Sequence, residues 1–116
     1  MKKILVVDDD EDMLGLVEYI LTTRGFDVHT HSTGLQVPQV VTSYHPNLIL
    51  LDIHLPGGKL GTQICKELKQ LNTIPIILFS ADADRLKSFE QCNAEAFIQK
   101  PFDSTNLINT INLHLN

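Results

Sequence analysis

Short apolar runs and helical patterns alternate along this chain, and this alternation limits the possible folds more than any other feature. Five runs have the length and composition of β-strands: Ile4–Val7, Phe26–Thr30, Leu48–Leu51, Ile76–Phe79 and Ala96–Ile98. The second run alternates apolar and polar residues, which predicts an edge strand with one wetter face. The other four runs are continuously apolar, so we expect them to be buried on both faces of a parallel sheet.

Helical periodicity fills the segments between these runs. Three apolar stripes are predicted: Met13, Leu16, Val17, Ile20 and Leu21; Ile64, Leu68 and Leu71; and Leu107, Ile108, Ile111 and Leu115. Leu86 and Phe89 predict a further short helix before Cys92. Pro38 lies inside the segment where the second helix is expected, so that helix either starts near this proline or is kinked by it.

Residues that favour helix ends flank the first and last of these stripes. The acids at positions 10–12 complement the positive end of a helix dipole, and Gly25 fits a stop at the other end. Asp103 or Ser104 could cap the last helix. We therefore expect residues 10–12 to open the first helix rather than to take part in chemistry.

The repeated alternation of strand and helix predicts a doubly wound α/β fold. Right-handed crossovers between five parallel strands give 2-1-3-4-5 as the expected order, a flavodoxin-like sheet flanked by helices. The length of 116 residues suits one domain, residues 1–116, that can bury a core without disulfides or structural metal.

Charge and composition exclude several classes of function. The formal net charge is −5 and there is no basic patch, so we expect no direct nucleic-acid binding. No apolar run approaches the ~18 residues of a membrane span, and the N-terminal run is too short for a signal peptide. We therefore expect a cytoplasmic protein without membrane contact. Cys65 and Cys92 form no C-x-x-C motif, and we interpret them as reduced, packed thiols.

Polar side chains follow four of the predicted strands where each strand ends. They are Asp8 and Asp9 after the first, Asp52 after the third, Ser80 after the fourth and Lys100 after the fifth. In an open α/β sheet, ligands bind beyond the carboxyl ends of the strands, where the strand order reverses. Three neighbouring carboxylates cannot all stay ionised without a cation, and oxygen ligands favour Mg²⁺.

This set of groups predicts phosphoryl transfer onto an aspartate. A carboxylate can attack phosphorus, while a metal ion and the Lys100 ammonium stabilise the charge on the phosphoryl oxygens. The Ser80 hydroxyl can hydrogen-bond one of those oxygens.

Two other interpretations of the acidic stretch fit less well. A metal-dependent phosphatase of the haloacid dehalogenase type needs D-x-D, which Asp8 and Asp10 satisfy, but it leaves Asp52 unexplained and needs a longer chain. An EF-hand calcium loop that starts at Asp8 needs glycine and glutamate where Met13 and Tyr19 stand.

Four motifs resemble those of the receiver domain of two-component response regulators. They are "ILVVDDDEDM", "PNLILLDIHLPGG", "IPIILFSA" and "FIQKPF", in the family's order over essentially the whole chain. The resemblance implies a domain that takes a phosphoryl group from a histidine kinase or histidine phosphotransfer protein, with Mg²⁺ as cofactor, and then switches the binding of a downstream protein. It implies no enzyme beyond the domain's own phosphorylation and dephosphorylation. A phosphorylation-dependent dimer stays open, and the alternative is a degenerate receiver that binds partners without phosphate.

Matching the motifs position by position assigns roles to single residues. The resemblance implies the acceptor Asp52, the catalytic residues Ser80 and Lys100, the switch residues Ser80 and Phe97, and the metal ligands Asp8, Asp9, Asp52 and the backbone carbonyl of His54. In this assignment Asp9 contacts Mg²⁺ directly and Asp8 acts through water or assists. The family also implies a cis Lys100–Pro101 bond.

The chain departs from the family pattern in two loops. Gly61 stands nine residues after Asp52 instead of eight, and Lys59 occupies a place that is often acidic. This longer loop leaves the start of the third helix open. Asn93 replaces a usual glycine before the fifth strand, and asparagine is the residue that best tolerates a left-handed backbone after glycine.

Overall fold

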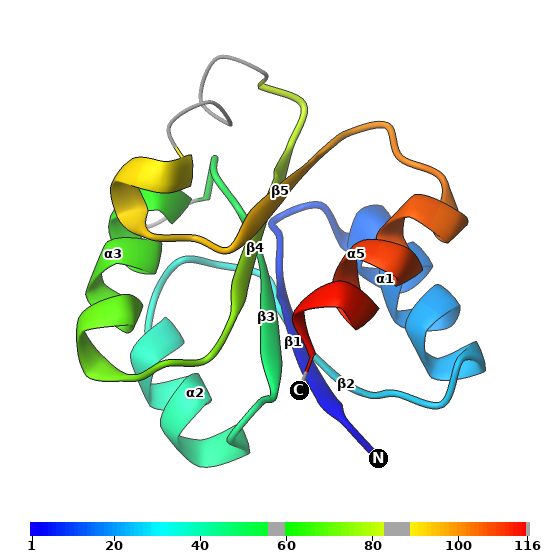
Figure 1. The fold of residues 1–116 in the computed structure, drawn as a ribbon, viewed down its shortest axis with the longest axis horizontal. Helices are drawn as coiled ribbons and strands as arrows, with labels where there is room; N and C mark the ends of the chain where they lie inside the picture. Colours follow the sequence, from blue (N-terminus) through cyan, green and yellow to red (C-terminus); the bar gives the residue numbers. More distant parts are fainter. Residues whose placement is uncertain (56–59, 83–88, 116) are drawn as a thin grey trace.

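A single parallel sheet forms the centre of the molecule. The computed structural model describes residues 1–55, 60–82 and 89–115. The strands are β1 (Lys3–Val7), β2 (Asp27–His31), β3 (Leu48–Asp52), β4 (Ile76–Ser80) and β5 (Ala96–Gln99). Their order is β2-β1-β3-β4-β5 and all four pairings are parallel (Figure 1). The predicted fold class and strand order are therefore confirmed.

Helices cover both faces of this sheet. They are α1 (Glu11–Thr23), α2 (Val37–Tyr44), α3 (Gly61–Leu71), the 3₁₀ helix η1 (Phe89–Cys92) and α5 (Ser104–His114). α1 and α5 lie on one face, and α2 and α3 lie on the other (Figure 1). Within the described ranges, no helix is both long and apolar enough to cross a bilayer. The predicted short helix corresponds in part to η1, but Leu86 lies outside the described residues.

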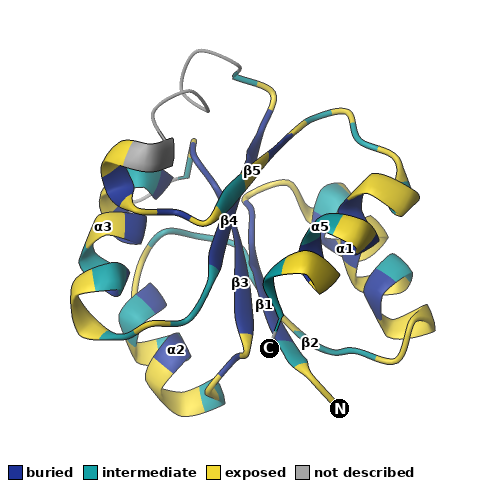
Figure 2. Ribbon diagram, in the orientation of Figure 1, coloured by how far each residue is buried: buried dark blue, intermediate teal, exposed yellow. Residues whose placement is uncertain are grey.

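Successive residues of each strand belong to two separate cores. Ile4 and Val6 of β1 pack beneath α1 and α5, whereas Leu5 and Val7 pack beneath α2 and α3. This alternation follows from the two-residue period of a strand. Figure 2 shows the result, with buried central strands and helices that are exposed on their outer sides. The sheet is thus packed on both faces.

The burial prediction is correct for β1, β3 and β4 but wrong for β5. Phe97 is 45% exposed and Ala96 is half-buried, while Ile98 is buried. β5 is the second edge strand, because β4 is its only neighbour in the sheet. Its apolar run is short, and a run of this length does not distinguish a two-sided from a one-sided strand.

Two of the predicted helix stripes are shifted or shortened in the structure. The buried residues of α1 are Leu14, Val17 and Leu21, whereas Leu16 is 51% exposed. Leu14, Val17 and Leu21 are spaced by three and four residues and share one face of the helix. Leu16, two positions after Leu14, lies on a different face. Leu71, the last residue of α3, is also exposed.

Local sequence explains where α1 begins and ends. The Asp10 carboxylate accepts hydrogen bonds from the backbone N–H groups of Asp12 and Met13, at 3.0 and 3.3 Å. Gly25 follows the helix with φ of +88°, a conformation that glycine adopts at little cost. Asp103 caps α5 in the same way as Asp10 caps α1, through the N–H of Asn106. The predicted roles of these end residues are confirmed.

Pro38 lies in the first turn of α2, so the helix starts beside the proline and is not kinked by it. Proline is tolerated at that position because the first N–H groups of a helix have no partner within it. Asn93, after η1, has φ of +65°, in agreement with the left-handed conformation expected for it.

Candidate functional site

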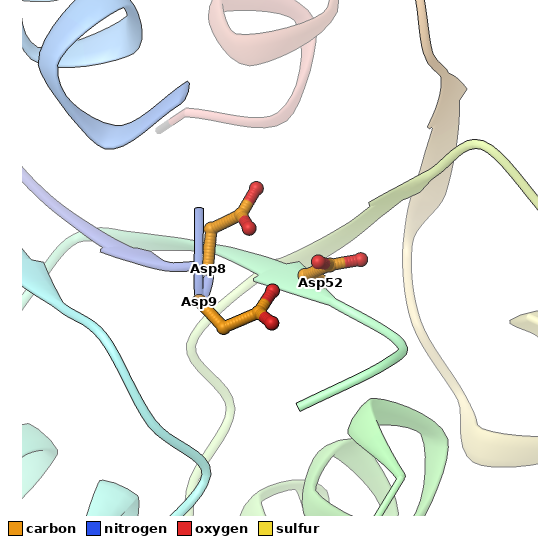
Figure 3. A group of neighbouring side chains, drawn as sticks. All are labelled: Asp8, Asp9 and Asp52. Atoms are coloured by element: carbon orange, nitrogen blue, oxygen red, sulfur yellow. The ribbon is translucent and has the colours of Figure 1, made fainter. Parts of the chain in front are cut away.

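Three carboxylates meet where β1 and β3 end. The two strands are parallel neighbours with Val7 opposite Leu51, so the residues that follow them emerge side by side. Asp8 and Asp9 extend from β1 and Asp52 ends β3, and their side chains gather in one place (Figure 3). One oxygen from each carboxylate lies within 4.8 Å of the other two, and this is the only such acidic cluster in the described part of the chain.

Lys100 brings a positive charge to this cluster from the end of β5. Its Nζ atom lies 2.7 Å from Asp8 Oδ2 and 3.5 Å from Asp52 Oδ2, and it also lies 4.5 Å from the ring centre of Phe79. Asp8 is fully buried and its other oxygen accepts the N–H of Asp10 at 3.0 Å. Both oxygens of this buried charge therefore have partners, as stability requires.

The environment of Asp52 shifts its protonation. Burial is the largest cause and raises the pKa of Asp52 from 3.8 to about 6, opposed by the Lys100 charge and supported by the charge of Asp8. The N–H of Ile53 donates to Asp52 Oδ1 at 2.8 Å and favours the ionised form. At pH 7 Asp52 is therefore ionised in most molecules, and the ionised carboxylate is the form that can act as a nucleophile.

An open pocket of roughly 420 Å³ connects these groups to solvent. Its lining consists of Asp9, Asp52, His54, Ser80, Ala81, Asp82 and Lys100. The strand-end residues predicted from the sequence thus surround one space, except that Asp8 lies buried behind it. Ser80 is 2% exposed, and its Oγ accepts the N–H of Asp82 at 3.1 Å.

The pocket also contains a residue that the sequence analysis missed. Asp82 Oδ2 lies 2.9 Å from His54 Nε2, so the two side chains form a bridge between the segments after β3 and β4. His54 stands two residues after Asp52, and Asp82 stands two residues after Ser80. Because β3 and β4 are neighbours, this equal spacing was the available signal for the pair.

Phe97 does not join the other predicted site residues. It lies on β5 opposite Leu78 of β4, and it is absent from the described lining of the pocket. Its predicted role as a switch residue is not supported by contact with the carboxylates and stays a prediction.

Gly61 packs closely against the backbone of Asp52 and Ile53. Its N–H donates to the carbonyl of Ile53 at 2.6 Å, and a Cβ atom at Gly61 would overlap the Asp52 carbonyl oxygen. α3 therefore begins at this glycine although the preceding loop is longer than in the family pattern. Lys59, in that loop, lies outside the described residues. The close approach of two backbones explains why a glycine is required at this position.

The donor set of the acidic cluster fits a hard divalent cation. Asp8, Asp9 and Asp52 offer only oxygen atoms, and the open pocket leaves room for water ligands, a combination that suits Mg²⁺. Asp10 does not contribute, because its carboxylate caps α1. The D-x-D arrangement of a phosphatase therefore has no support in the geometry.

Comparison with known proteins gives one family over nearly the whole chain. A model of the response regulator receiver domain matches residues 4–112. The BeF3-activated N-terminal receiver domain of Klebsiella pneumoniae RstA is 29% identical over 99% of both chains, with a TM-score of 0.93. The N-terminal domain of the nisin resistance regulator NsrR, a lantibiotic response regulator, is 30% identical over 100% of this chain and 99% of its own, with a TM-score of 0.88.

A longer chain of known structure contains a region similar to this one. NtrX from Brucella abortus, solved in complex with ATP, is 30% identical and has a TM-score of 0.90. The match covers 97% of this chain but only 26% of the NtrX chain.

Proposed function

Because this chain belongs to the response regulator receiver domain family of two-component systems, we propose that it is a phospho-accepting signalling domain with Asp52 as the acceptor. Receiver domains interact with kinases and with downstream effectors. The observation that carries the proposal is the meeting of Asp52 with two further carboxylates and Lys100 in one open pocket. Residues 1–116 would act as a single receiver unit.

The proposed reaction is an in-line displacement at phosphorus. An oxygen of the ionised Asp52 carboxylate attacks the phosphoryl group of a phosphohistidine, on a histidine kinase or a histidine phosphotransfer protein. The P–N bond breaks, the imidazole leaves with the electron pair, and an acyl phosphate remains on Asp52. The added phosphoryl group makes this position larger and more negative, and this change would alter which downstream protein the domain binds.

Lys100 and Ser80 would stabilise the transferred group. The Lys100 ammonium lies 3.5 Å from Asp52 Oδ2, so it can approach an oxygen of a phosphoryl group that is attached to that carboxylate. The Ser80 hydroxyl lines the same pocket and can donate to a second oxygen. These contacts would tie the ends of β4 and β5 to the phosphorylation state of β3.

Mg²⁺ would be held by Asp8, Asp9, Asp52 and the backbone carbonyl of His54. When bound, the ion supplies positive charge that offsets the negative charge of the phosphoryl oxygens. Within the protein, the Lys100 ammonium contributes positive charge beside the two buried carboxylates Asp8 and Asp52.

Intact mass spectrometry after incubation with acetyl phosphate tests the proposal. With Mg²⁺ present, we expect the chain to gain the mass of one phosphoryl group, and chelation of Mg²⁺ should suppress the gain. Hydroxylamine should remove the added mass, because it cleaves acyl phosphates. If no gain occurs at any donor or Mg²⁺ concentration, the chain is instead a receiver that binds partners without phosphate.

Asp9→Ala is expected to weaken Mg²⁺ binding by about tenfold or more, a loss on the order of 1.4 kcal/mol. Asp9 is the exposed member of the three-carboxylate cluster, so its removal takes away a ligand without leaving a buried charge unpaired. Isothermal titration with MgCl₂ measures the effect without any phosphoryl donor. Glu11→Gln is the matched control, because Glu11 is a nearby exposed acid outside the cluster. Equal affinity in Asp9→Ala and the wild type would remove Asp9 from the metal site.

His54→Ala is expected to shorten the lifetime of the phosphoryl group several-fold. The exposed His54 side chain lines the pocket and contacts Asp82, so its ring can shield the acyl phosphate from water. Dephosphorylation of purified phosphoprotein, followed by mass spectrometry, gives the rate. His114→Ala, at the far end of α5, serves as the control. Identical rates for His54→Ala and the wild type would reject the shielding role.

A further inference from the structure

Two cysteines that are distant in the sequence lie next to each other in the core. Cys65 belongs to α3 and Cys92 ends η1, and these two elements pack together. The Sγ atom of Cys65 donates to the backbone carbonyl of Cys92 at 3.4 Å, and both residues belong to the core beneath α2 and α3. Neither cysteine forms a disulfide, and they are 0% and 3% exposed.

The two thiols also differ in acidity. The neighbouring Cys65 side chain is the largest cause that lowers the pKa of Cys92 to about 7, against the opposing effect of burial. The Cys92 side chain, followed by burial, raises the pKa of Cys65. One sulfur of the pair is therefore the better thiolate, and the other stays protonated beside it.

A salt bridge holds the two elements in this arrangement. Lys69 of α3 lies 2.9 Å from Glu95, three residues after Cys92, and Glu95 also accepts the N–H of Ile76 on β4. The bridge therefore links α3 to the segment after η1 close to both cysteines, with Lys69 four residues after Cys65 and Glu95 three residues after Cys92.

We propose that Cys65 and Cys92 form a redox-sensitive dithiol that a peroxide converts into an intramolecular disulfide between α3 and η1. This inference is independent of the phosphoryl-transfer proposal, because neither cysteine lines the carboxylate pocket within the described residues. The structure agrees with our interpretation of the two residues as reduced, packed thiols, and the proposal adds a reaction between them.

The chemistry balances with hydrogen peroxide as oxidant. The Cys92 thiolate attacks one peroxide oxygen, the O–O bond breaks and hydroxide leaves, which gives a sulfenic acid on Cys92. The Cys65 sulfur then attacks the Cys92 sulfur, its proton goes to the leaving hydroxyl group, and water departs as the S–S bond forms. In total, two thiols and one peroxide give one disulfide and two waters, and a dithiol reductant reverses the change.

The disulfide would join two elements that are connected along the chain to groups of the phosphoryl-transfer site. α3 begins at Gly61 against the backbone of Asp52, and η1 precedes β5, which leads to Lys100. A covalent link closing the loop between positions 65 and 92 restricts the unfolded chain, so the oxidised protein should melt at a higher temperature than the reduced protein.

The test treats the folded 116-residue chain with hydrogen peroxide in native buffer and in urea. In native buffer we expect monomeric protein that is lighter by two hydrogen atoms, resists alkylation after denaturation and yields one cross-linked peptide containing both cysteines. Dithiothreitol should restore both thiols. Cys65→Ala and Cys92→Ala should show no such loss of hydrogen, and thermal melts confirm that these variants fold.

Two results would overturn the inference. The first is that the wild type keeps two alkylatable thiols in native buffer but forms the disulfide readily in urea, which means that burial blocks the reaction. The second is that oxidation yields only intermolecular dimers or oxygen adducts. If Cys65→Ala fails to fold, Cys65→Val, which keeps an apolar side chain of similar size, replaces it in the comparison.

Discussion

Asp52→Asn is expected to abolish the mass gain from acetyl phosphate while stabilising the metal-free fold at pH 7. Asparagine has nearly the same shape and keeps an oxygen that can accept the Ile53 N–H. It has no carboxylate to attack phosphorus, so the phosphoryl group cannot be transferred to this position. It also removes a carboxyl group whose ionisation the fold disfavours, because burial raises the pKa of Asp52 to about 6.

The sign of the stability effect follows from that pKa. The folded state holds the Asp52 proton more tightly than the unfolded chain, where the pKa is near 3.8. Below pH ~4 Asp52 is protonated in both the folded and the unfolded state and does not lower the unfolding free energy. Above pH ~6 Asp52 is ionised in both states, and burial of the charge lowers the unfolding free energy by its full amount. The gain in unfolding free energy for Asp52→Asn should therefore grow between pH 4 and 6 and then level off. Its upper limit is on the order of 3 kcal/mol.

Urea unfolding of both proteins at several pH values, with EDTA present, measures this difference. Titrations common to both chains cancel when the two free energies are subtracted. Asp12→Asn is the control, since Asp12 is an exposed acid in the first turn of α1 and should alter neither property strongly. Phosphorylation of Asp52→Asn would contradict the assignment of the acceptor. A stability difference that does not change with pH would contradict the account of its burial.

Gly61→Ala is expected to lower the unfolding free energy by roughly 2–4 kcal/mol and to reduce phosphorylation together with it. The added Cβ would overlap the Asp52 carbonyl oxygen and approach the Cα of Ile53 to 2.8 Å. These atoms belong to the backbone of a buried strand end and cannot rotate away, so relief requires a shift of α3 or of β3. A shift of β3 would move the acceptor relative to Lys100.

Gly15→Ala provides a matched control for this substitution. Gly15 lies within α1, where an added Cβ would meet nothing within 4 Å. Alanine is the better helix former, so this change should stabilise the chain by about 0.5–1 kcal/mol. Denaturant unfolding and the acetyl phosphate assay give both readouts. Equal stability of Gly61→Ala and the wild type would show that the contact at Asp52 does not constrain the backbone.

The sheet and the position of its acidic cluster could be predicted because both depend on local pattern. A buried strand needs a run of apolar residues, and a parallel sheet presents the residues that follow such runs at one edge. Asp8, Asp52 and Lys100 come from different parts of the chain, yet the topology places them within salt-bridge distance. The expected strand order was therefore enough to bring the acidic cluster and the lysine together.

The features that escaped prediction depend on tertiary contacts. The exposure of Phe97 follows from the position of β5 at the edge of the sheet, which its apolar sequence does not reveal. The approach of Cys65 to Cys92 results from the packing of α3 on η1, and no spacing motif in the sequence predicts it. The bridge between His54 and Asp82 joins two loops whose side chains the strand pattern leaves undefined.

The division of each strand between two cores has a consequence for how the length of this chain can change. Deleting one residue from β1 would exchange Ile4 and Val6 with Leu5 and Val7 between the cores and would turn Asp8 to the opposite face. An insertion after β3 carries no such penalty, because Gly61 still reaches the Asp52 backbone across a loop longer than the family pattern. Insertions and deletions, in evolution or in engineering, should therefore be confined to the loops, while the strands that carry the carboxylates keep their length.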